Sequence, residues 1–186
     1  MSQVAAKTFG QQGSFSETLI DPRTFMWIAS RKTLVLPVLL HYHSDPSRPY
    51  DISDAFQGSL VLGIDPETGI NERREITHMD LSAIASQREK ACMTYISSTS
   101  SEPQCKKLIG GGEYCLPVTQ TWVPSYCYAD STPESYMAYN SWEYQRSFVA
   151  RSVYIGSYLF VMSDDKVTVH NMDGSYNQMA SVDWER

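Results

Sequence analysis

The four cysteines are the residues of this 186-residue chain with the most defined chemistry, and all of them lie between residues 92 and 127. Their spacings do not match the CxxC pairs of a zinc site. They can form two disulfides with any of three connectivities, remain unpaired structural thiols, or include a reactive nucleophile, for which the sequence supplies no adjacent base. The surrounding segment is poor in core residues, which favours disulfides. The disulfide candidates are Cys92, Cys105, Cys115 and Cys127.

A His-x-His pair, His41 and His43, is the nearest that the sequence comes to a metal site. On a strand the two side chains would point to the same face, and Asp45 follows two residues later. No third or fourth ligand is defined, so we interpret the pair as half-exposed histidines near a strand end. The sequence therefore predicts no metal site and no cofactor. His78 and His170 are isolated in the sequence and are also interpreted as strand-end residues.

The segment of residues 121–144 is dense in tyrosine and tryptophan. Rigid, amphipathic side chains of this kind are favoured at binding surfaces. Alternatively, they pack on one another and on the structure beneath them. If the chain binds a ligand or a protein, this segment is the predicted surface. The binding candidates are Trp122, Tyr126, Tyr128, Tyr136, Trp142 and Tyr144.

The overall composition is that of a folded domain and excludes several functions. Hydrophobic residues make up 42% of the chain and charged residues 19%, which are values of globular proteins. The net charge of −6 and the scattered basic residues argue against a nucleic-acid partner. No apolar run is long enough for a membrane helix, and the first residues lack the apolar core of a secretory signal. We therefore expect a globular module with no membrane span and no signal peptide in this chain.

Alternating apolar residues, bounded by Gly, Asp, Pro and Ser, indicate strands in two parts of the chain. Four strands in up-and-down order are expected within residues 25–78, with Pro37 marking a bulge or an unpaired edge. Four more are expected within residues 147–182, with a turn at Gly156. Each set is a four-stranded antiparallel meander of the size of a propeller blade. The predicted fold class is all-β, with two blades of an incomplete propeller.

The segment between the two meanders is predicted to be a loop insertion rich in cysteine and tyrosine. Within it, residues 80–88 could form one or two helical turns, with Asp80 as the N-cap. The expected organisation has four parts in chain order. Residues 1–20 are the tail of a preceding blade or disordered, 21–79 are the first blade, 80–146 are the Cys- and aromatic-rich insertion, and 147–186 are the second, C-terminal blade.

Four segments of the chain resemble the C-terminal part of the secreted β-propeller domain family of bacteria and archaea. The most specific feature is the order Arg-Ser-aromatic-Ile-Gly-x-Tyr-Leu, which begins at Arg151. The chain departs from the family after Asp21 and in the length of its insertion. The family offers no catalytic residues to carry over. The resembling segments are residues 21–38, 56–65, 74–78 and 151–169.

The resemblance implies an exported protein in an extracellular, cell-surface or periplasmic setting, and a propeller with more blades than two. Two blades cannot close a ring, because propellers have about four to eight. Three arrangements follow. The chain is a piece of a longer propeller, it completes a ring with a partner chain, or its two sheets fold face to face as a sandwich.

The predicted function is a non-catalytic scaffold or ligand- and protein-binding module. The alternative is a propeller-type hydrolase or redox enzyme domain with a loop-built pocket. The sequence favours the non-enzymatic role, because it contains no nucleophile elbow, Gly-rich phosphate loop or HExxH motif. The enzyme alternative requires a pocket that gathers His41 or His78 with carboxylates.

Overall fold

The computed structural model describes residues 5–43, 45, 47, 52–97, 103–107, 110–117 and 124–184. The contacts within the chain divide it into two compact units. The first unit joins the segments Met1–Leu40, Phe56–Met79 and Trp142–Arg186. The second unit consists of His41–Ala55 and Asp80–Ser141. Two strands of the chain therefore begin in one unit and end in the other.

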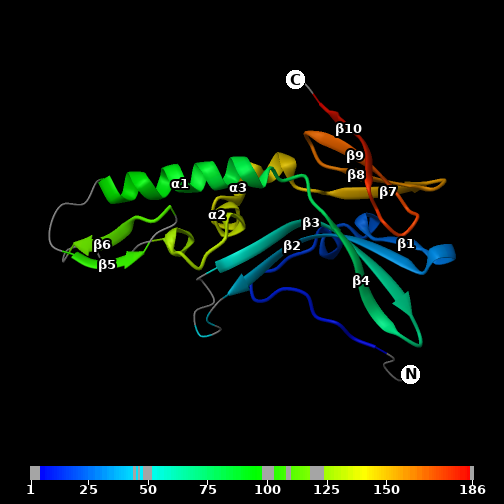
Figure 1. The fold of residues 1–186 in the computed structure, drawn as a ribbon. Helices are drawn as coiled ribbons and strands as arrows, with labels where there is room; N and C mark the ends of the chain where they lie inside the picture. The colour runs from blue at the N-terminus through cyan, green and yellow to red at the C-terminus, as the bar shows by residue number, and fades with distance from the viewer. Residues whose placement is uncertain are drawn as a thin grey trace. The chain divides into compact units, whose positions relative to one another are not determined.

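The first unit contains a four-stranded antiparallel sheet whose strands follow one another in chain order (Figure 1). The turn between its third and fourth strands is held by Asp65, whose carboxylate accepts hydrogen bonds from the backbone N–H groups of Glu67 and Thr68. Gly69 closes the turn with a φ of 81°, a conformation that favours glycine. The strands are β1 (Met26–Ile28), β2 (Thr33–His43), β3 (Ile52–Asp65) and β4 (Gly69–Ile76).

Pro37 lies inside β2, where a proline would normally interrupt the hydrogen-bond ladder. β1 pairs with β2 only as far as Val35. The next partner on that side is Phe15, which exchanges two backbone hydrogen bonds with Leu39. Pro37 falls between these pairs, and its carbonyl accepts a hydrogen bond from Ser16 Oγ at 2.7 Å. The missing N–H of Pro37 therefore faces a gap in the ladder, which is the unpaired position that the sequence led us to expect.

The second sheet is also a four-stranded antiparallel meander, in the order β10-β9-β8-β7. A two-residue turn, Gly156-Ser157, joins β7 to β8, and the pair Ile155↔Tyr158 flanks it. Gly156 has a φ of 64°, which the first position of such a hairpin turn requires. The strands are β7 (Arg151–Ile155), β8 (Tyr158–Met162), β9 (Lys166–Asn171) and β10 (Gln178–Asp183).

The inner faces of the two sheets pack on each other and form the core of the first unit. Polar contacts also cross this junction. Ser59 Oγ lies 3.0 Å from Ser152 Oγ. The amide of Gln57 donates to the carbonyl of Val149 at 3.2 Å and accepts from its N–H at 3.1 Å. The buried apolar cluster consists of Ile28, Val35, Val61, Ile76, Val149, Leu159, Val161, Met172 and Tyr176.

The outer face of the first sheet is covered. Leu60 and Leu62 of β3 alternate with Val61 of the core and so point outward, yet they are only 1% and 2% exposed. The N-terminal segment passes beside this sheet, where Gly10 lies against Leu40 and Phe15 pairs with Leu39. This segment therefore belongs to the folded structure of the first unit.

The outer face of the second sheet is open within the described part of the chain. The inward residues Ser152, Leu159 and Val161 of β7 and β8 are buried. On the opposite face, Val153, Ile155 and Tyr158 are 37%, 60% and 47% exposed. Val182 of β10 is 55% exposed. The two sheets of the first unit thus differ in their outer faces.

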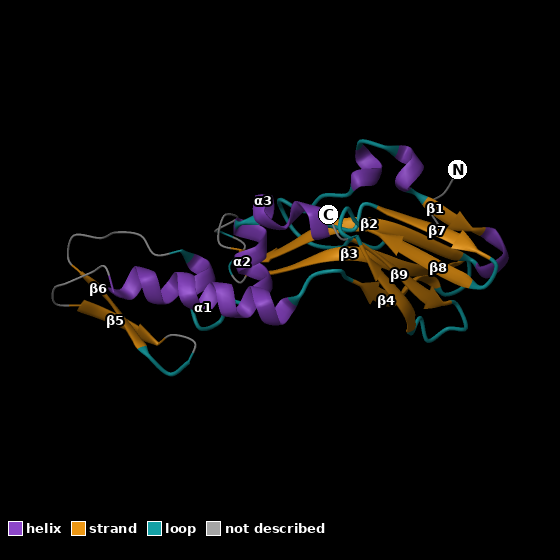
Figure 2. Cartoon of the chain, turned by 90° about the horizontal axis from the view of Figure 1, so that it is seen from above, coloured by secondary structure: helices purple, strands orange, loops and turns teal. Residues whose placement is uncertain are grey.

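The second unit contains a long helix, α1 (Leu81–Ser97), and short elements that follow it (Figure 2). Asp80 caps the helix, because its carboxylate accepts from the N–H groups of Ser82 and Ala83 at 3.1 and 3.0 Å. The helix has 17 residues, which is longer than the one or two turns expected from the sequence. The other elements are β5 (Pro103–Lys107), β6 (Glu113–Pro117), the 3-10 helix η4 (Ser125–Cys127), α2 (Pro133–Tyr139) and, at the boundary of the units, α3 (Ser141–Tyr144).

The two four-stranded meanders confirm the predicted fold class, an all-β architecture with two blade-like sheets. The sheets do not close into a ring within the described residues. The insertion contributes helices to this architecture. The four-part division of the chain at residues 20, 79 and 146 stays a proposal, since residues 41–55, which lie within the proposed first blade, belong to the second compact unit.

Candidate functional site

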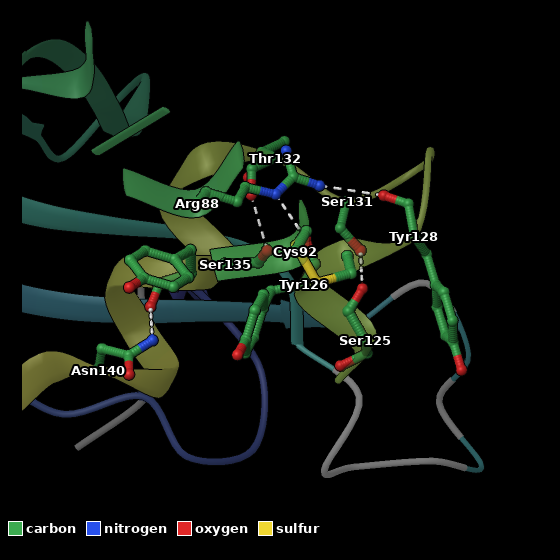
Figure 3. The surroundings of a disulfide bond; sticks show 11 residues. Arg88, Cys92, Ser125, Tyr126, Tyr128, Ser131, Thr132, Ser135 and Asn140 are labelled. Carbon is green, nitrogen blue, oxygen red and sulfur yellow. Dashed lines mark hydrogen bonds between the residues drawn. A yellow bond between two sulfur atoms is a disulfide. The ribbon is translucent and has the colours of Figure 1, made fainter. Parts of the chain in front are cut away.

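A disulfide and a buried arginine tie α1 to η4 in the second unit (Figure 3). Cys92 and Cys127 form the disulfide, with their Cα atoms 5.7 Å apart. Arg88, four residues earlier on the same face of α1, is 4% exposed. Its guanidinium donates to the carbonyls of Tyr126 at 2.5 Å and Tyr128 at 3.0 Å. Burial lowers the pKa of Arg88, but the group stays charged because its ordinary value is far above neutrality.

Three tyrosines pack beside this crosslink. The ring of Tyr126 meets that of Tyr136 edge to face at 5.1 Å and that of Tyr139 at 5.5 Å. Tyr136 is only 9% exposed. The hydroxyl of Tyr139 lies 2.6 Å from Ser125 Oγ and accepts from the N–H of Ile52 at 3.0 Å. These rings therefore contribute to the small core of the second unit.

The other predicted binding residues lie apart from this cluster. Tyr128 is half-buried in the second unit. Trp142, which is 70% exposed, and the half-buried Tyr144 belong to the first unit. Trp122 lies outside the described residues. Binding at the aromatic residues remains a prediction.

The other two cysteines lie on β5 and β6. Cys105 is the direct partner of Cys115 in this antiparallel hairpin. Because Cys92 is bonded to Cys127, one of the three connectivities remains for a second disulfide, Cys105–Cys115.

The histidines of the His-x-His pair end β2. His43 is buried and His41 is half-buried. Burial, with a smaller contribution from His43, lowers the pKa of His41. Among the residues that the structure describes, no group of three or more His, Cys, Asp or Glu side chains is placed to hold a metal ion.

A cavity of about 380 Å³ lies at the junction of the two sheets in the first unit. Glu17 and Asp164 are the charged residues of its wall, and Phe15 and Phe148 contribute aromatic rings. Gln57 lines it as well, although its amide is already bonded to Val149. The remaining wall is formed by Pro37, Val38, Leu39, Gln145, Val149 and Ala150. A negatively charged, partly aromatic cavity favours a cationic group with an apolar body.

A buried polar chain crosses the same junction. His78, which follows β4, lies with Nδ1 2.8 Å from Ser163 Oγ and Nε2 2.9 Å from Thr168 Oγ1. His170 Nε2 is also 2.9 Å from Thr168 Oγ1. Ser163 Oγ donates to Asp165 Oδ1 at 2.7 Å. The interpretation of His78 and His170 as separate strand-end residues was therefore incomplete, because they are the two imidazoles of one network.

Neither the cavity nor the polar chain was found by sequence reasoning. The signal for the chain was present in the alternation of β9, where Thr168 and His170 occupy the inward positions that apolar residues usually fill. The cavity gave no such signal, because its wall comes from five separate stretches of sequence. His78 and His41 are not among the residues that line it.

The comparison with protein families identifies the class of this chain. The model of the β-propeller domain matches residues 1–109, which is more than half of the sequence. The chain belongs to the β-propeller domain family. The match includes the first sheet and ends before the second, whose blade character rests on its own four-stranded meander.

The searches of curated proteins and of solved structures found no match for the chain. In the described part of the chain, no helix has the length and apolar character to cross a membrane.

Proposed function

We propose that the chain is a non-catalytic β-propeller module that acts as a scaffold by binding a further sheet on the outer face of its second sheet. The observation that carries this proposal is the open apolar face of β7–β10. Val153, Phe160 and Val169 lie side by side across three strands of this face. Ile155 and Val182, at its two ends, are 60% and 55% exposed. A contiguous apolar surface of this kind marks a partner site.

The partner expected on this face is another four-stranded sheet. In a propeller each blade is covered on both faces by its neighbours, and the inner face of the second sheet is already covered by the first. The outer face of the first sheet is not the proposed partner site, since its residues Leu60 and Leu62 are already buried. The further sheet would come from the same polypeptide, if the chain is a piece of a longer propeller, or from a partner chain that completes the ring.

Radical footprinting of the native protein tests this proposal. The native protein, isolated from its source, and the 186-residue chain alone would be labelled in parallel. We expect Tyr158 and Val182 to be protected in the native protein and labelled in the isolated chain. Met93 of α1, which is 62% exposed, provides the reference position for equal labelling. Equal labelling of Tyr158 and Val182 in both samples would overturn the proposal.

The mass of the native protein distinguishes the two possible sources of the partner sheet, the same polypeptide or a partner chain. Native mass spectrometry of the protein from its source gives either one longer polypeptide or a complex of chains. An Ile155→Glu, Val182→Glu variant is expected to dissociate a complex of chains. In a longer polypeptide, the same variant is expected to expose the face to labelling without changing the mass.

We also propose that the protein works outside the cytoplasm. The Cys92–Cys127 disulfide supports this, because structural disulfides persist in oxidising compartments. Fractionation of the source cells, followed by alkylation of free thiols, checks the proposal. Recovery of the chain from the cytosol with these thiols reduced would contradict it.

A second candidate function is binding of a basic group in the cavity between the sheets. Glu17 and Asp164 supply negative charge, and the rings of Phe15 and Phe148 favour an alkylammonium or guanidinium group. The volume of about 380 Å³ suits a single side chain or a small amine. The ligand class proposed is therefore a lysine- or arginine-like group of a peptide or small molecule.

Calorimetric titration with Nα-acetyl-arginine amide tests the cavity. A Glu17→Gln, Asp164→Asn variant is expected to weaken binding about 5- to 30-fold, because each of the two charge contacts contributes roughly 0.5–1 kcal/mol at such a site. Glu67→Gln, which removes an exposed carboxylate from the β3–β4 turn, is the matched control. Equal binding by both variants would exclude this cavity as the site.

A further inference from the structure

Five short contacts connect Asp165 to the backbone carbonyl of Tyr176 through the junction of the two sheets. In order, they join the Asp165 carboxylate to Ser163 Oγ at 2.7 Å, Ser163 Oγ to His78 Nδ1 at 2.8 Å, and His78 Nε2 to Thr168 Oγ1 at 2.9 Å. The last two join Thr168 Oγ1 to His170 Nε2 at 2.9 Å and His170 Nδ1 to Tyr176 O at 3.1 Å. Each group in this line touches the next, and Ser163 Oγ also lies 3.3 Å from both the backbone nitrogen and the carbonyl oxygen of Lys166.

The number of protons in this line is one fewer than the number of contacts. Both ends are acceptors, a carboxylate and a backbone carbonyl. Between them the two hydroxyls supply one proton each, and the two imidazoles supply one each when neutral. Four protons therefore serve the five contacts, and one contact always brings two lone pairs together. A buried polar contact without its proton is unfavourable.

We propose that this line is a binding site for a single proton, which it takes up between the two sheets of the first unit. With one added proton every contact holds a hydrogen bond. Nδ1 of both histidines then donates outward, to Ser163 and to Tyr176. The two Nε2 atoms share the remaining imidazole proton through Thr168, whose hydroxyl donates to one ring while accepting from the other.

A second proton would disrupt the line. With both rings charged, both Nε2 atoms would carry a hydrogen toward Thr168, whose own hydroxyl hydrogen would then have no acceptor in the line. The two imidazolium rings would also repel each other. The site is therefore selective for one proton, and a doubly protonated pair is expected to separate the histidines.

Charged groups of both signs surround the site. Asp165 is in the line itself, and its other oxygen accepts from Ser147 Oγ at 2.5 Å. Asp165 and Asp183 favour a charged His78, whereas Lys166 and a charged His170 oppose it. Arg74 of β4 opposes charge on His170. Burial lowers the pKa of both histidines, to about 4 for His78, so the proton is taken up below neutral pH.

Uptake at this site acts on the contact between the sheets. His78 follows the last strand of the first sheet, whereas Ser163 follows β8 of the second sheet and Thr168 and His170 belong to its strand β9. The added proton converts a repulsive contact into a hydrogen bond in the line that connects them. Uptake of the first proton is therefore expected to complete the hydrogen bonds of this line, and uptake of a second proton to separate the two histidines.

Nitrogen NMR of the histidine rings in the full 186-residue chain tests the proposal. On lowering the pH from neutrality, His78 and His170 are expected to shift with one common midpoint and a total uptake of one proton. In that state both Nδ1 atoms are protonated and both Nε2 shifts are intermediate. Two separate one-proton titrations in the folded chain, or two fully neutral rings until the chain unfolds, would overturn the proposal.

A pair of variants at Thr168 separates a shared proton from simple burial. Thr168→Ser keeps the hydroxyl and is expected to keep the common midpoint. Thr168→Val removes it, and the common midpoint should be lost although the backbone amide spectrum stays that of the folded chain. A common midpoint in folded Thr168→Val would contradict sharing through Thr168. If Thr168→Val does not fold, the proton count and the Nε2 shifts of the wild type and of Thr168→Ser decide the question.

Discussion

At the scale of single residues, Gln57 connects the two sheets through both atoms of its amide. It is 3% exposed, and it holds both the N–H and the carbonyl of Val149. Gln57→Leu would leave both backbone groups buried without a partner. We expect a loss of about 2 kcal/mol or more in the free energy of unfolding, measured by urea denaturation.

The matched control for this prediction is Gln178→Leu, because Gln178 is exposed on β10. That change should alter the free energy of unfolding by less than about 0.5 kcal/mol. Gln57→Glu should also destabilise the chain, since it removes the donor to Val149 and places a carboxylate in the junction. Equal stabilities of Gln57→Leu and Gln178→Leu would show that the amide is not a link between the sheets.

The buried histidines make the stability of the first unit depend on pH. Burial lowers the pKa of His78 to about 4 and also lowers the pKa of His170, whereas an unfolded histidine titrates near ~6.5. The unfolded chain then binds more protons below ~6.5 than the folded chain. The contribution of the pair is therefore full above ~6.5 and is lost as the pH falls toward about 4.

The steepness of this loss depends on how many protons the folded chain accepts. Each proton bound only by the unfolded chain contributes a slope of about 1.4 kcal/mol per pH unit. If the folded chain binds one proton at this pair, the unfolded chain, which binds two, exceeds it by only one. The pair then contributes a slope closer to that of one proton than to that of two. Urea midpoints across the pH range, compared between the wild type and a His78→Gln, His170→Gln variant, measure it. An unchanged pH dependence in the variant would contradict the prediction.

At the scale of elements, the β5–β6 hairpin is predicted to carry the second disulfide. Cys105 and Cys115 are direct partners across the two antiparallel strands, where the Cα atoms of a pair are about 4.5–5.5 Å apart, within the range that a disulfide spans. Alkylation before reduction should modify none of the four cysteines, and peptide mapping should find Cys105 joined to Cys115. Peptides that join Cys92 or Cys127 to Cys105 or Cys115 would contradict this connectivity.

Some elements were accessible from the sequence and others were not, for physical reasons. The strands around Gly156 could be predicted from the sequence, because alternation and a turn that requires positive φ are both local properties. The full length of α1 could not be predicted, because its apolar residues form only a weak amphipathic pattern. The contacts of Arg88 and Cys92 that hold this helix are made with residues 35 to 40 positions away in the sequence. Tertiary contacts of this kind override local propensity.

The same limit applies to the sites. Among four cysteines the sequence left three connectivities open, because pairing depends on distances in the fold. Trp142 and Tyr136 are indistinguishable as aromatic residues in one segment, yet one is 70% exposed and the other 9%. His78 and His170 are 92 positions apart in the chain, and only the packing of the two sheets brings both rings to Thr168.

At the scale of the whole molecule, the division into two units predicts two separate responses to reduction. The Cys92–Cys127 crosslink lies wholly within the second unit. It closes a loop over a sequence separation of 35 residues, for which the chain-entropy model gives about 4 kcal/mol of stabilisation. The core of the first unit contains no cysteine. Loss of the crosslink should therefore destabilise α1 and leave β8 and β9 unaffected.

Hydrogen exchange measured by mass spectrometry distinguishes the two units. In Cys92→Ser, Cys127→Ser, the amides of α1 are expected to exchange faster, since a helix that loses its anchor to η4 opens more often. The amides of β8 and β9, in the middle of the second sheet, should exchange at the wild-type rate. Gln57→Leu should give the opposite pattern, with faster exchange in β8 and β9 and an unchanged α1. Faster exchange throughout the chain in both variants would mean that the two units unfold as one.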